Sequence, residues 1–350
     1  MKIGIPREIK PLEGRVGLVP EACGELLTAG HQVFLEIGAG ESSGYPDQRY
    51  QDLGVVILPD AEAIYGEAEL IVKVKEPVGP ELNLLRREHL LFSYLHLAAN
   101  TDLLQRLQQI GLTAVAFETV EEQGSLPLLA PMSDIAGRLA IQIGTHLLHR
   151  PEGGKGVLLG GLPAAGRGKV VVLGAGNAGG NAARLAAALG AEVTVFDRKR
   201  EKLLEMRELG DNVTALYPYS AQVDHSVRQA DLVIGAVLVP GARATHVVSA
   251  EQVAGMEAGS VVVDISVDQG GCIETTRPTT YEDPTYQVSG VTHLAVTNMP
   301  GAVPRSASQA LSASLIPYVL EMAAGRWRDN PALRMGINLE AGEIIHPALK

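Results

Sequence analysis

The segment Lys169-Val170-Val171-Val172-Leu173-Gly174-Ala175-Gly176-Asn177-Ala178-Gly179 carries the most informative pattern in this 350-residue chain. Its apolar first half predicts a buried strand, and the pattern G-x-G-x-x-G follows that strand without a gap. An alanine-rich helix is expected over 181–189, and a second strand over 192–196 ends in Asp197. Glycine triplets are common in turns. A strand, a glycine loop, a helix, a strand and a terminal acid in this order nevertheless predict a dinucleotide-binding unit.

Each part of the glycine loop has a separate role in such a unit. Gly174 permits the tight turn, and Gly176 lets the backbone approach a pyrophosphate. Gly179 lets the helix pack closely on the strand. The pyrophosphate is expected at the start of the helix, beside Asn177 and Ala178, where free N–H groups and the helix dipole favour an anion.

The acid at the end of the second strand predicts which dinucleotide binds. Asp197 stands 23 residues after Gly174, where a carboxylate can accept hydrogen bonds from the ribose diol. The same carboxylate would repel a 2′-phosphate, so Asp197 favours NAD over NADP. The basic run Arg198, Lys199 and Arg200 follows directly, so a basic clamp for NADP stays open as the alternative.

Composition and charge narrow the class of protein. Hydrophobic residues make up 46% of the chain and charged residues 20%, which is typical of a packed globular protein, and the length predicts two domains. The net charge of −11 offers no basic stripe for nucleic acid. Cys23 and Cys272 are far apart in sequence, which excludes a disulfide framework and favours a reducing cytoplasm. We see neither a signal-peptide pattern nor an apolar run of roughly 18 residues, so no membrane association is expected.

Strands and helices alternate along the chain in two blocks. Short apolar runs separated by helical patterns fill the first 130 residues, and a second alternating block runs from 169 to 297. This alternation predicts parallel sheets covered by helices on both faces. A long helix is expected to open within 131–134 and to run to about His149. Another is expected over 306–324, where Pro317 is expected to introduce a kink.

We therefore predict an α/β protein with two doubly wound Rossmann-like domains. Both domains are expected to contain parallel sheets and to be joined by the two long helices around a cleft. Residues 1–130, completed by 306–350, are interpreted as the substrate domain. Residues 131–305 are interpreted as the NAD-binding Rossmann domain.

Polar side chains follow the carboxyl ends of several predicted strands, which is the edge where open parallel sheets bind ligands. They are Arg15, Lys75, His96, Asp268 and Asn298. A guanidinium offers a planar fork for a substrate carboxylate. An ammonium group stabilises a carbonyl oxygen that becomes negative, and an imidazole moves protons near neutral pH.

Each of these residues also has a structural explanation when it is taken alone. A lysine at a strand end is commonly a solvated tip, and a histidine after an apolar strand is commonly a packed residue. Arg15 can form a surface pair with Glu13, and Asp268 before two glycines can simply form a turn. Ser133 is expected to cap the long helix that begins beside it. The histidines at 146, 149, 225 and 246 are interpreted as structural.

Longer segments carry a resemblance to a known family. They are GIPRE (4–8), RVG (15–17), VKVKEP (72–77), YLHLA (94–98), APMS (130–133), GAVLVPG (235–241), VDQGGC (267–272) and NMPGA (298–302). With these segments, which span nearly the whole chain, the sequence resembles bacterial alanine dehydrogenases. That family is related to the soluble NAD-binding subunit of proton-translocating transhydrogenase.

The resemblance implies an activity and roles for individual residues. It implies the reversible NAD-dependent oxidative deamination of L-alanine to pyruvate and ammonium. By resemblance, Arg15 and Lys75 bind the substrate, while His96 and Asp268 are the catalytic acid–base groups. The residues implied to lie along the cofactor are Ser133, Ala178, Asp197, Lys202, Ser220, Leu238, Val239, Ile265, Ser266, Val267, Asp268, Arg277, Val296, Thr297, Asn298 and Met299.

The resemblance also bears on metals and on assembly. Some members of the family bind a divalent metal through a glutamate and a histidine one turn apart on the last long helix. Here Gly325 stands four residues after Glu321, so no metal is expected. The family further implies a homo-oligomer, specifically a homohexamer, with small molecules as the other partners.

Other functions remain as alternatives. One is a transhydrogenase subunit, which needs a membrane partner. Another is an opine- or saccharopine-type dehydrogenase, which acts on a larger amino acid. A third is an NAD-sensing or structural protein without activity, against which the intact Lys75, His96 and Asp268 argue.

Overall fold

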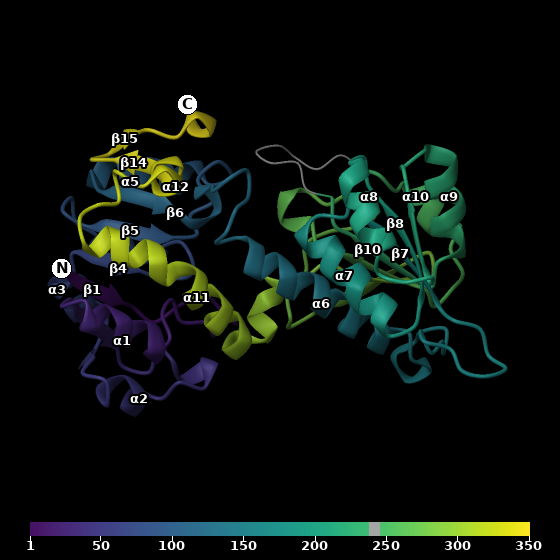
Figure 1. Ribbon diagram of the computed structural model, residues 1–350, viewed down its shortest axis with the longest axis horizontal. Helices are drawn as coiled ribbons and strands as arrows, with labels where there is room; N and C mark the ends of the chain where they lie inside the picture. Colours follow the sequence, from purple (N-terminus) through teal and green to yellow (C-terminus); the bar gives the residue numbers. More distant parts are fainter. Residues whose placement is uncertain (238–245) are drawn as a thin grey trace. The chain divides into compact units, whose positions relative to one another are not determined.

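The chain folds into two compact α/β units. The computed structural model describes residues 1–237 and 246–350. Unit 1 comprises Met1–Met132 and Gly301–Lys350, and unit 2 comprises Ser133–Pro300. Both units have a Rossmann-like arrangement of helices around a mainly parallel sheet, which confirms the predicted fold class (Figure 1).

The sheet of unit 1 is built mainly from the first part of the chain. Its strands are β1 (Lys2–Ile5), β2 (Gln32–Glu36), β3 (Val56–Leu58), β4 (Leu70–Val72), β5 (Leu90–Ser93), β6 (Thr113–Ala116), β14 (Ile337–Glu340) and β15 (Glu343–Ile344). They lie in the order β15-β14-β6-β5-β4-β1-β2-β3. β1 to β6 are parallel, whereas β14 and β15 add antiparallel strands beside β6 (yellow beside blue in Figure 1).

The helices of unit 1 flank this sheet. They are α1 (Pro20–Thr28), η1 (Glu41–Ser43), α2 (Asp47–Gln51), α3 (Ala61–Glu67), α4 (Glu81–Leu84), α5 (Thr101–Ile110), η2 (Phe117–Thr119), α11 (Pro304–Ala323), α12 (Pro331–Gly336) and η6 (Pro347–Leu349). The side chain of Asn100 caps α5 by accepting a hydrogen bond from Leu103 N. α11 lies wholly in unit 1 and contains Pro317.

The sheet of unit 2 has the strand order of a dinucleotide-binding domain. Its strands are β7 (Lys169–Leu173), β8 (Glu192–Phe196), β9 (Val213–Leu216), β10 (Leu232–Gly235), β11 (Val261–Asp264), β12 (Thr285–Val288) and β13 (Val291–Leu294). They lie in the order β12-β13-β11-β10-β7-β8-β9, and β12 pairs antiparallel with β13 at one edge.

The helices of unit 2 begin with a long one that crosses the unit boundary. They are α6 (Ala130–Leu147), η3 (Arg150–Glu152), α7 (Asn177–Ala188), α8 (Arg200–Arg207), α9 (Ser220–Gln229), α10 (Ala250–Ala254), η4 (Val267–Gln269) and η5 (Met299–Ala302). The chain passes from unit 1 to unit 2 within α6 and returns within η5, immediately before α11.

In each sheet the strand order reverses direction at one point. In unit 1 this point lies between β1 and β4, and in unit 2 it lies between β7 and β10. At such a point the connections on either side run to opposite faces of the sheet, which leaves a crevice at the carboxyl ends of the two strands. The two reversal points therefore mark the sheet edge at which open α/β sheets generally bind ligands.

Several predicted boundaries were wrong by a few residues. The apolar runs at 69–75 and 260–267 predict strands of those lengths, but β4 ends at Val72 and β11 ends at Asp264. Strand ends depend on where the neighbouring strand stops, which the local sequence does not encode. Ser133 does not cap α6, because that helix begins at Ala130 and Ser133 lies within its first turn.

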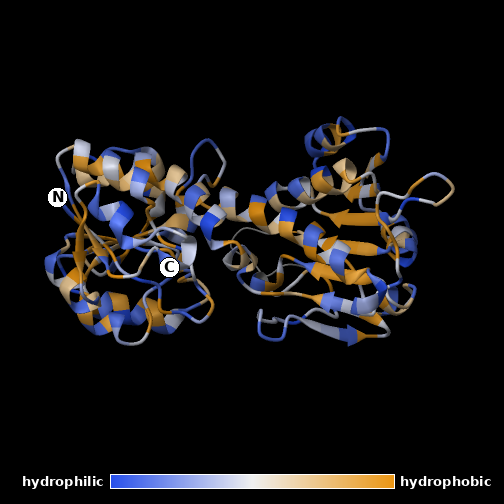
Figure 2. Ribbon diagram, turned by 90° about the horizontal axis from the view of Figure 1, so that it is seen from below, coloured by the Kyte–Doolittle hydropathy of each residue, from blue (hydrophilic) through white to orange (hydrophobic). Residues whose placement is uncertain are grey.

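The cores are apolar and the outer helix faces are polar. Figure 2 shows the strands as mainly hydrophobic, whereas the helices that cover them alternate hydrophobic and hydrophilic stretches. Fully buried side chains on neighbouring strands, such as Ile3, Ile71 and Leu91 in unit 1, pack between sheet and helices. In the described part of the chain, no helix combines the length and the apolar character that crossing a membrane requires.

We predict opposite effects of two glycine-to-alanine substitutions in unit 2. At Gly137 on α6, an added Cβ would lie 2.0 Å from Ala178 O on α7, so Gly137→Ala should lower the free energy of unfolding by about 1–3 kcal/mol or more. At Gly180, within α7, the nearest atoms would be 3.6 Å away. Gly180→Ala should therefore raise stability by about 0.5–1 kcal/mol. Urea unfolding of both variants tests this, and a stable Gly137→Ala protein would contradict the close contact of α6 with α7.

Candidate functional site

The glycine loop of unit 2 leaves open the position that a dinucleotide needs. Gly174 has a φ of 93°, and a Cβ there would lie 2.6 Å from Ala236 O. A Cβ at Gly179 would lie 1.8 Å from Gly174 O. At Gly176, the residue before α7, a Cβ would meet no atom within 4 Å. The protein's own packing thus requires the first and third glycines, while the second borders free space beside a helix N-terminus, as a bound pyrophosphate requires.

Asp197 holds the glycine loop in place. One carboxylate oxygen accepts a hydrogen bond from Ala175 N at 2.7 Å, and the other accepts one from Lys199 N at 2.8 Å. The carboxylate is partly exposed at the carboxyl end of β8. Each oxygen has a further lone pair, so this arrangement leaves acceptor capacity for a ribose diol.

The start of α6 lies against the start of α7. Asn181 joins the two helices, because its side chain donates to Asp134 Oδ1 at 2.8 Å and accepts from Arg138 Nε at 3.1 Å. Ser133, one turn before Gly137, lies at the same end of α6. Two further predicted residues lie on the neighbouring helices. Lys202 on α8 pairs with Glu205 at 3.0 Å, and Ser220 is the first residue of α9, the helix that follows β9.

A buried carboxylate organises the loop after β11. Asp264 is 0% exposed and accepts hydrogen bonds from Ser266 N and Cys272 N, both at 2.9 Å. It also accepts one from Thr276 Oγ1 at 2.7 Å. These contacts fix both ends of the segment that contains the predicted residues Ile265, Ser266, Val267 and Asp268. Asp268 itself lies exposed in η4.

The segment after β13 contains a strained residue. Asn298 has a φ of 67°, which is uncommon for a residue with a side chain and is typical of functional sites. Before it, Val296 is buried and Thr297 N donates to Thr279 O at 3.2 Å. After it, Met299 O accepts a hydrogen bond from the Tyr281 hydroxyl at 2.8 Å. Arg277 lies exposed over the Tyr286 ring, and the predicted residues Leu238 and Val239 lie outside the described residues.

In unit 1, Arg15 is buried in a tight ion pair. Its guanidinium donates to both carboxylate oxygens of Glu13, at 2.7 and 2.5 Å, and to Met132 Sδ at 3.1 Å. The Arg15 side chain is only 2% exposed. Burial disfavours its charge, but the Glu13 carboxylate outweighs this and raises the pKa of Arg15. Arg15 therefore pairs with Glu13, as its structural explanation predicts. The pair is buried, however, and does not lie on the surface.

The backbone that follows Arg15 is hydrogen-bonded to serine side chains of α11. Val16 N donates to Ser308 Oγ and Val19 N donates to Ser312 Oγ, both at 3.0 Å. Ser43 extends this contact, since its hydroxyl donates to Gly14 O at 2.7 Å.

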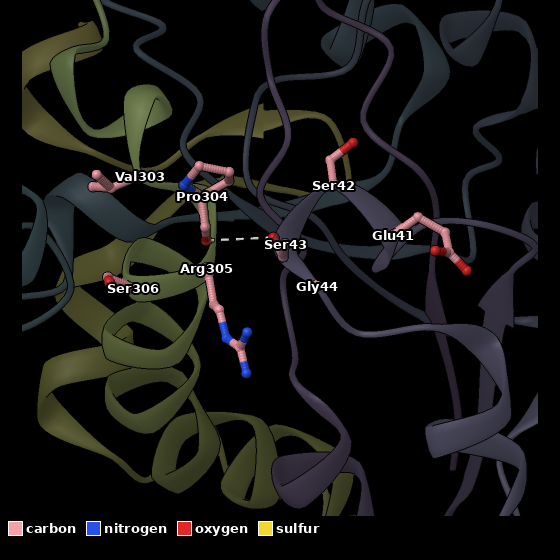
Figure 3. A pocket seen from close by; sticks show the side chains of 8 residues that line it. All are labelled: Glu41, Ser42, Ser43, Gly44, Val303, Pro304, Arg305 and Ser306. Carbon is pink, nitrogen blue, oxygen red and sulfur yellow. Dashed lines mark hydrogen bonds between the residues drawn. The ribbon is translucent and has the colours of Figure 1, made fainter.

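A shallow hollow of about 440 Å³ lies beside these serines in unit 1 (Figure 3). It is lined by Glu41, Ser42, Ser43, Gly44, Val303, Pro304, Arg305 and Ser306. None of the predicted catalytic or substrate-binding residues lines it.

Lys75 lies three residues beyond β4, at that reversal point. Its backbone N–H donates to the Glu8 carboxylate at 3.3 Å. Burial lowers the pKa of Lys75, and the Arg15 guanidinium lowers it further, while the Glu13 and Glu76 carboxylates act in the opposite direction. The ammonium of Lys75 thus lies within electrostatic reach of the Arg15–Glu13 pair.

His96 is held in an unusual backbone conformation beyond β5. Its φ is 50°, and its N–H donates to Glu118 Oε1 at 2.6 Å. Its Nδ1 lies 3.9 Å from the same oxygen, and the side chain is 50% exposed. The His96 ring is parallel to the buried ring of Tyr94, with centroids 5.9 Å apart. The imidazole is therefore presented to solvent from a fixed turn.

The predicted residues gather within each unit. In unit 1, Arg15, Lys75 and His96 all lie beyond the carboxyl ends of β1, β4 and β5, which are neighbours in the sheet. In unit 2, the glycine loop and the segments after β8, β11 and β13 occupy the carboxyl edge in the same way. Sequence reasoning missed carboxylates that accept backbone hydrogen bonds at these two edges. They are Glu8 and Glu118 in unit 1 and Asp264 in unit 2.

Comparison with known proteins identifies the family. Residues 4–136 match the family described as Alanine dehydrogenase/PNT, N-terminal domain, and residues 140–347 match Alanine dehydrogenase/PNT, C-terminal domain. The chain belongs to the alanine dehydrogenase/PNT family. It is 46% identical to alanine dehydrogenase from Mycolicibacterium smegmatis, over 100% of this chain and 96% of the relative.

Solved structures of the alanine dehydrogenase/PNT family have the same fold. An L-alanine dehydrogenase structure matches with a TM-score of 0.96 and 49% identity, and the match covers 100% of this chain and 98% of the other. A transhydrogenase structure from Sinorhizobium meliloti matches with a TM-score of 0.87 and 27% identity, over 99% of this chain and 100% of the other.

Glu321, which raised the question of a metal in this family, is engaged in an ion pair. Its carboxylate accepts from Arg326 Nη2 at 3.0 Å on the surface of unit 1. Across residues 1–237 and 246–350, no three histidine, cysteine or acidic side chains gather as metal ligands.

We predict that the Glu13–Arg15 pair gives unit 1 a pH-dependent stability. Burial alone would raise the pKa of Glu13, but hydrogen bonds and the charge of Arg15 bring it below its ordinary 4.5. The carboxylate therefore stabilises the fold above about pH 4.5, and this contribution is lost as the pH falls through the lowered folded pKa. Glu13→Gln should lower the free energy of unfolding at pH 7 by about 3–5 kcal/mol, the cost of breaking a buried pair.

Chemical denaturation at several pH values checks this prediction. The difference in free energy of unfolding between the wild-type protein and Glu13→Gln should become smaller below pH 4.5. The exposed pair of Glu21 with Arg49, at 2.6 Å, provides the control, since Glu21→Gln should change stability by less than about 1 kcal/mol. A difference for Glu13→Gln that stays constant with pH would count against the assigned ionisation.

Proposed function

We propose that this chain is an NAD-dependent alanine dehydrogenase. It would interconvert L-alanine, NAD⁺ and water with pyruvate, ammonium, NADH and a proton. The observation that carries the proposal is the placement of Arg15 and Lys75 at the reversal point of the unit 1 sheet, in a member of the alanine dehydrogenase/PNT family. An amino-acid or keto-acid carboxylate needs a guanidinium, and its carbonyl oxygen needs a second positive charge.

The residues of unit 2 fit an NAD molecule. The open position at Gly176 and the N–H groups that begin α7 suit the pyrophosphate, and Asp197 suits the adenosine ribose. When bound, the nicotinamide ring supplies the hydride acceptor or donor. The other residues proposed to line the cofactor are Ser133, Gly174, Asn177, Ala178, Gly179, Lys202, Ser220, Leu238, Val239, Ile265, Ser266, Val267, Asp268, Arg277, Val296, Thr297, Asn298 and Met299.

Arg15 and Lys75 are proposed to bind the substrate in different ways. The Arg15 guanidinium is oriented by Glu13, and we propose that this fixed, planar cation attracts the substrate carboxylate. Lys75 would stabilise negative charge on the carbonyl oxygen of pyruvate. Because burial and Arg15 lower the pKa of Lys75, its charge is lost at a lower pH than that of an ordinary lysine. The activity with pyruvate should accordingly decline earlier on the alkaline side.

His96 and Asp268 are proposed as the acid–base groups. An exposed imidazole on a fixed turn can take a proton as water adds in deamination and return it in the reverse direction. Asp268, on an exposed turn of unit 2, is proposed to orient water, ammonia or the carbinolamine. The protein is further proposed to work in the cytoplasm, which its two distant cysteines favour, and as a homohexamer, as the family resemblance implies.

A substrate panel read at the absorbance of NADH tests the proposal. L-alanine with NAD⁺ should produce NADH, and pyruvate with ammonium should consume it. Lys75→Ala should abolish turnover, and His96→Ala should lower kcat/KM by roughly 10²–10⁴-fold, while both variants keep their NADH affinity. A protein that oxidises only larger amino acids, or that reduces NADP⁺ with NADH and no amino acid, would replace this proposal by one of the alternatives.

Asp197 should determine cofactor choice. Asp197→Ala removes a proposed ribose contact and also the acceptor of Ala175 N and Lys199 N. We expect NAD⁺ binding to weaken by about 1–3 kcal/mol. NADP⁺ should become usable, because the basic residues Arg198 and Lys202 remain in this part of the chain. Equilibrium titration with both cofactors measures this. An unchanged preference for NAD⁺ over NADP⁺ would remove Asp197 from the ribose site.

A further inference from the structure

The two strands at the reversal point of unit 1 separate at their carboxyl ends. β1 ends at Ile5, and Pro6 follows. On the other side of β4, hydrogen bonds to the β5 chain continue for two more residues, because Lys73 N donates to Phe92 O and Tyr94 N donates to Val74 O. Successive amides of an extended chain point to opposite sides. The next amide, that of Val74, therefore faces the side where β1 has already ended.

A carboxylate takes the place of the missing strand. Glu8 Oε1 accepts a hydrogen bond from Val74 N at 2.6 Å. Lys75 N lies 3.3 Å from both oxygens of the same carboxylate. The Glu8 side chain is only 2% exposed. Charge-assisted hydrogen bonds of this kind to backbone N–H groups are stronger than neutral ones.

A buried lysine and a second carboxylate balance the charge of Glu8. Lys73 Nζ lies 3.4 Å from Glu8 Oε2 and 3.0 Å from Glu81 Oε1, and its side chain is 1% exposed. Glu81 also accepts from Val78 N at 2.9 Å and from the Tyr65 hydroxyl at 3.1 Å. Burial raises the pKa of Glu8, and the Lys73 cation works against that increase. The cluster is held by contacts within the protein.

The pattern Lys73-Val74-Lys75 therefore contains two lysines with different tasks. Residues two apart in an extended chain point to the same face, but here the chain turns after Val74. The Lys73 side chain forms ion pairs with Glu8 and Glu81. Lys75 is partly exposed and lies close enough to Arg15 for that charge to lower its pKa. Glu8 touches both: it pairs with the side chain of Lys73 and with the backbone of Lys75.

We propose that Glu8 is a positioning residue that sets the location of the Lys75 ammonium through its backbone amide. This inference rests on the proposed function for the role of Lys75 with substrate. Glu8 does not contact the substrate itself, because its oxygens are occupied by Val74, Lys75 and Lys73. Displacing a substrate-binding group by about 1 Å costs roughly a hundredfold in rate.

Glu8→Gln tests this role against a purely structural one. The variant removes the charge and turns an NH₂ group toward either the backbone amides or Lys73. We expect kcat/KM for pyruvate to fall roughly tenfold to a hundredfold, with NADH affinity unchanged. Glu81→Gln is the matched control, since it removes a carboxylate from the same cluster but leaves Glu8 on the amides of Val74 and Lys75. Glu81→Gln should lower the thermal stability about as much as Glu8→Gln does, but its kcat/KM should stay close to that of the wild-type protein.

The ionisation of Lys75 provides a second measurement that does not require turnover. Its pH-dependent acylation, followed by mass spectrometry, reports its pKa in each variant. The charged groups with the largest effects on the pKa of Lys75 are Arg15, Glu13, Glu76 and Lys10, and none of them is changed. Because burial is the main cause of the lowered pKa, release of Lys75 toward solvent in Glu8→Gln should raise its pKa, and Glu81→Gln should leave it in place.

Definite outcomes separate the possibilities. If Glu8→Gln loses stability to the same extent as Glu81→Gln, with wild-type kcat/KM and an unchanged Lys75 pKa, the positioning role is overturned. If Glu8→Gln does not fold, Glu8→Asp retains the charge but withdraws it from the amides, and wild-type behaviour of that variant also overturns the role. An inactive wild-type protein whose Lys75 pKa still responds to Glu8→Gln would refute the proposed function and leave the positioning role supported.

Discussion

Where parallel strands diverge at their carboxyl ends, backbone N–H groups lose the carbonyl partners that the sheet supplied, and buried N–H groups without acceptors are costly. In this protein acidic side chains accept those groups at the functional edges of both sheets. Carboxylates that do so include Glu8, Glu118, Asp197 and Asp264. Each accepts hydrogen bonds from at least two backbone amides. The loops that carry the proposed substrate and cofactor residues are therefore fixed by single side chains, and not by further secondary structure.

A carboxylate suits this task because it only accepts and has several lone pairs in one plane. The cost is the burial of a negative charge, which must be met by donors or by counter-charges. Glu8 shows the cost directly, since its pKa is raised by burial despite the nearby Lys73. Glu13 shows the opposite result. Burial also acts to raise its pKa, but the hydrogen bonds and charge of the Arg15 guanidinium outweigh burial and lower the pKa. The same edge thus holds both the stabilising and the costly carboxylate, which is typical of functional sites.

The sequence predicted those parts of the fold whose signals are local. The bounds of β7 (Lys169–Leu173) and β8 (Glu192–Phe196) were predicted without error, because an apolar run between turn residues marks both ends. The end of β4 was misplaced by three residues, since it depends on where β1 stops. The antiparallel strands β14 and β15 were not predicted. They are short and complete a sheet whose other strands lie more than 200 residues earlier.

The site divides in the same way between local and non-local information. Lys75 and His96 were predicted as site residues because they lie in segments that resemble the family and follow predicted strands. Glu8 and Glu118 were not predicted, because they accept hydrogen bonds from backbone N–H groups 66 and 22 residues away. The backbone of His96 explains why such an acceptor is needed. A positive φ outside glycine costs about 1–3 kcal/mol and persists only where surrounding contacts hold it. The hydrogen bond from His96 N to Glu118 offsets part of that cost, so the exposed imidazole owes its fixed direction to a residue of η2, the short helix that follows β6.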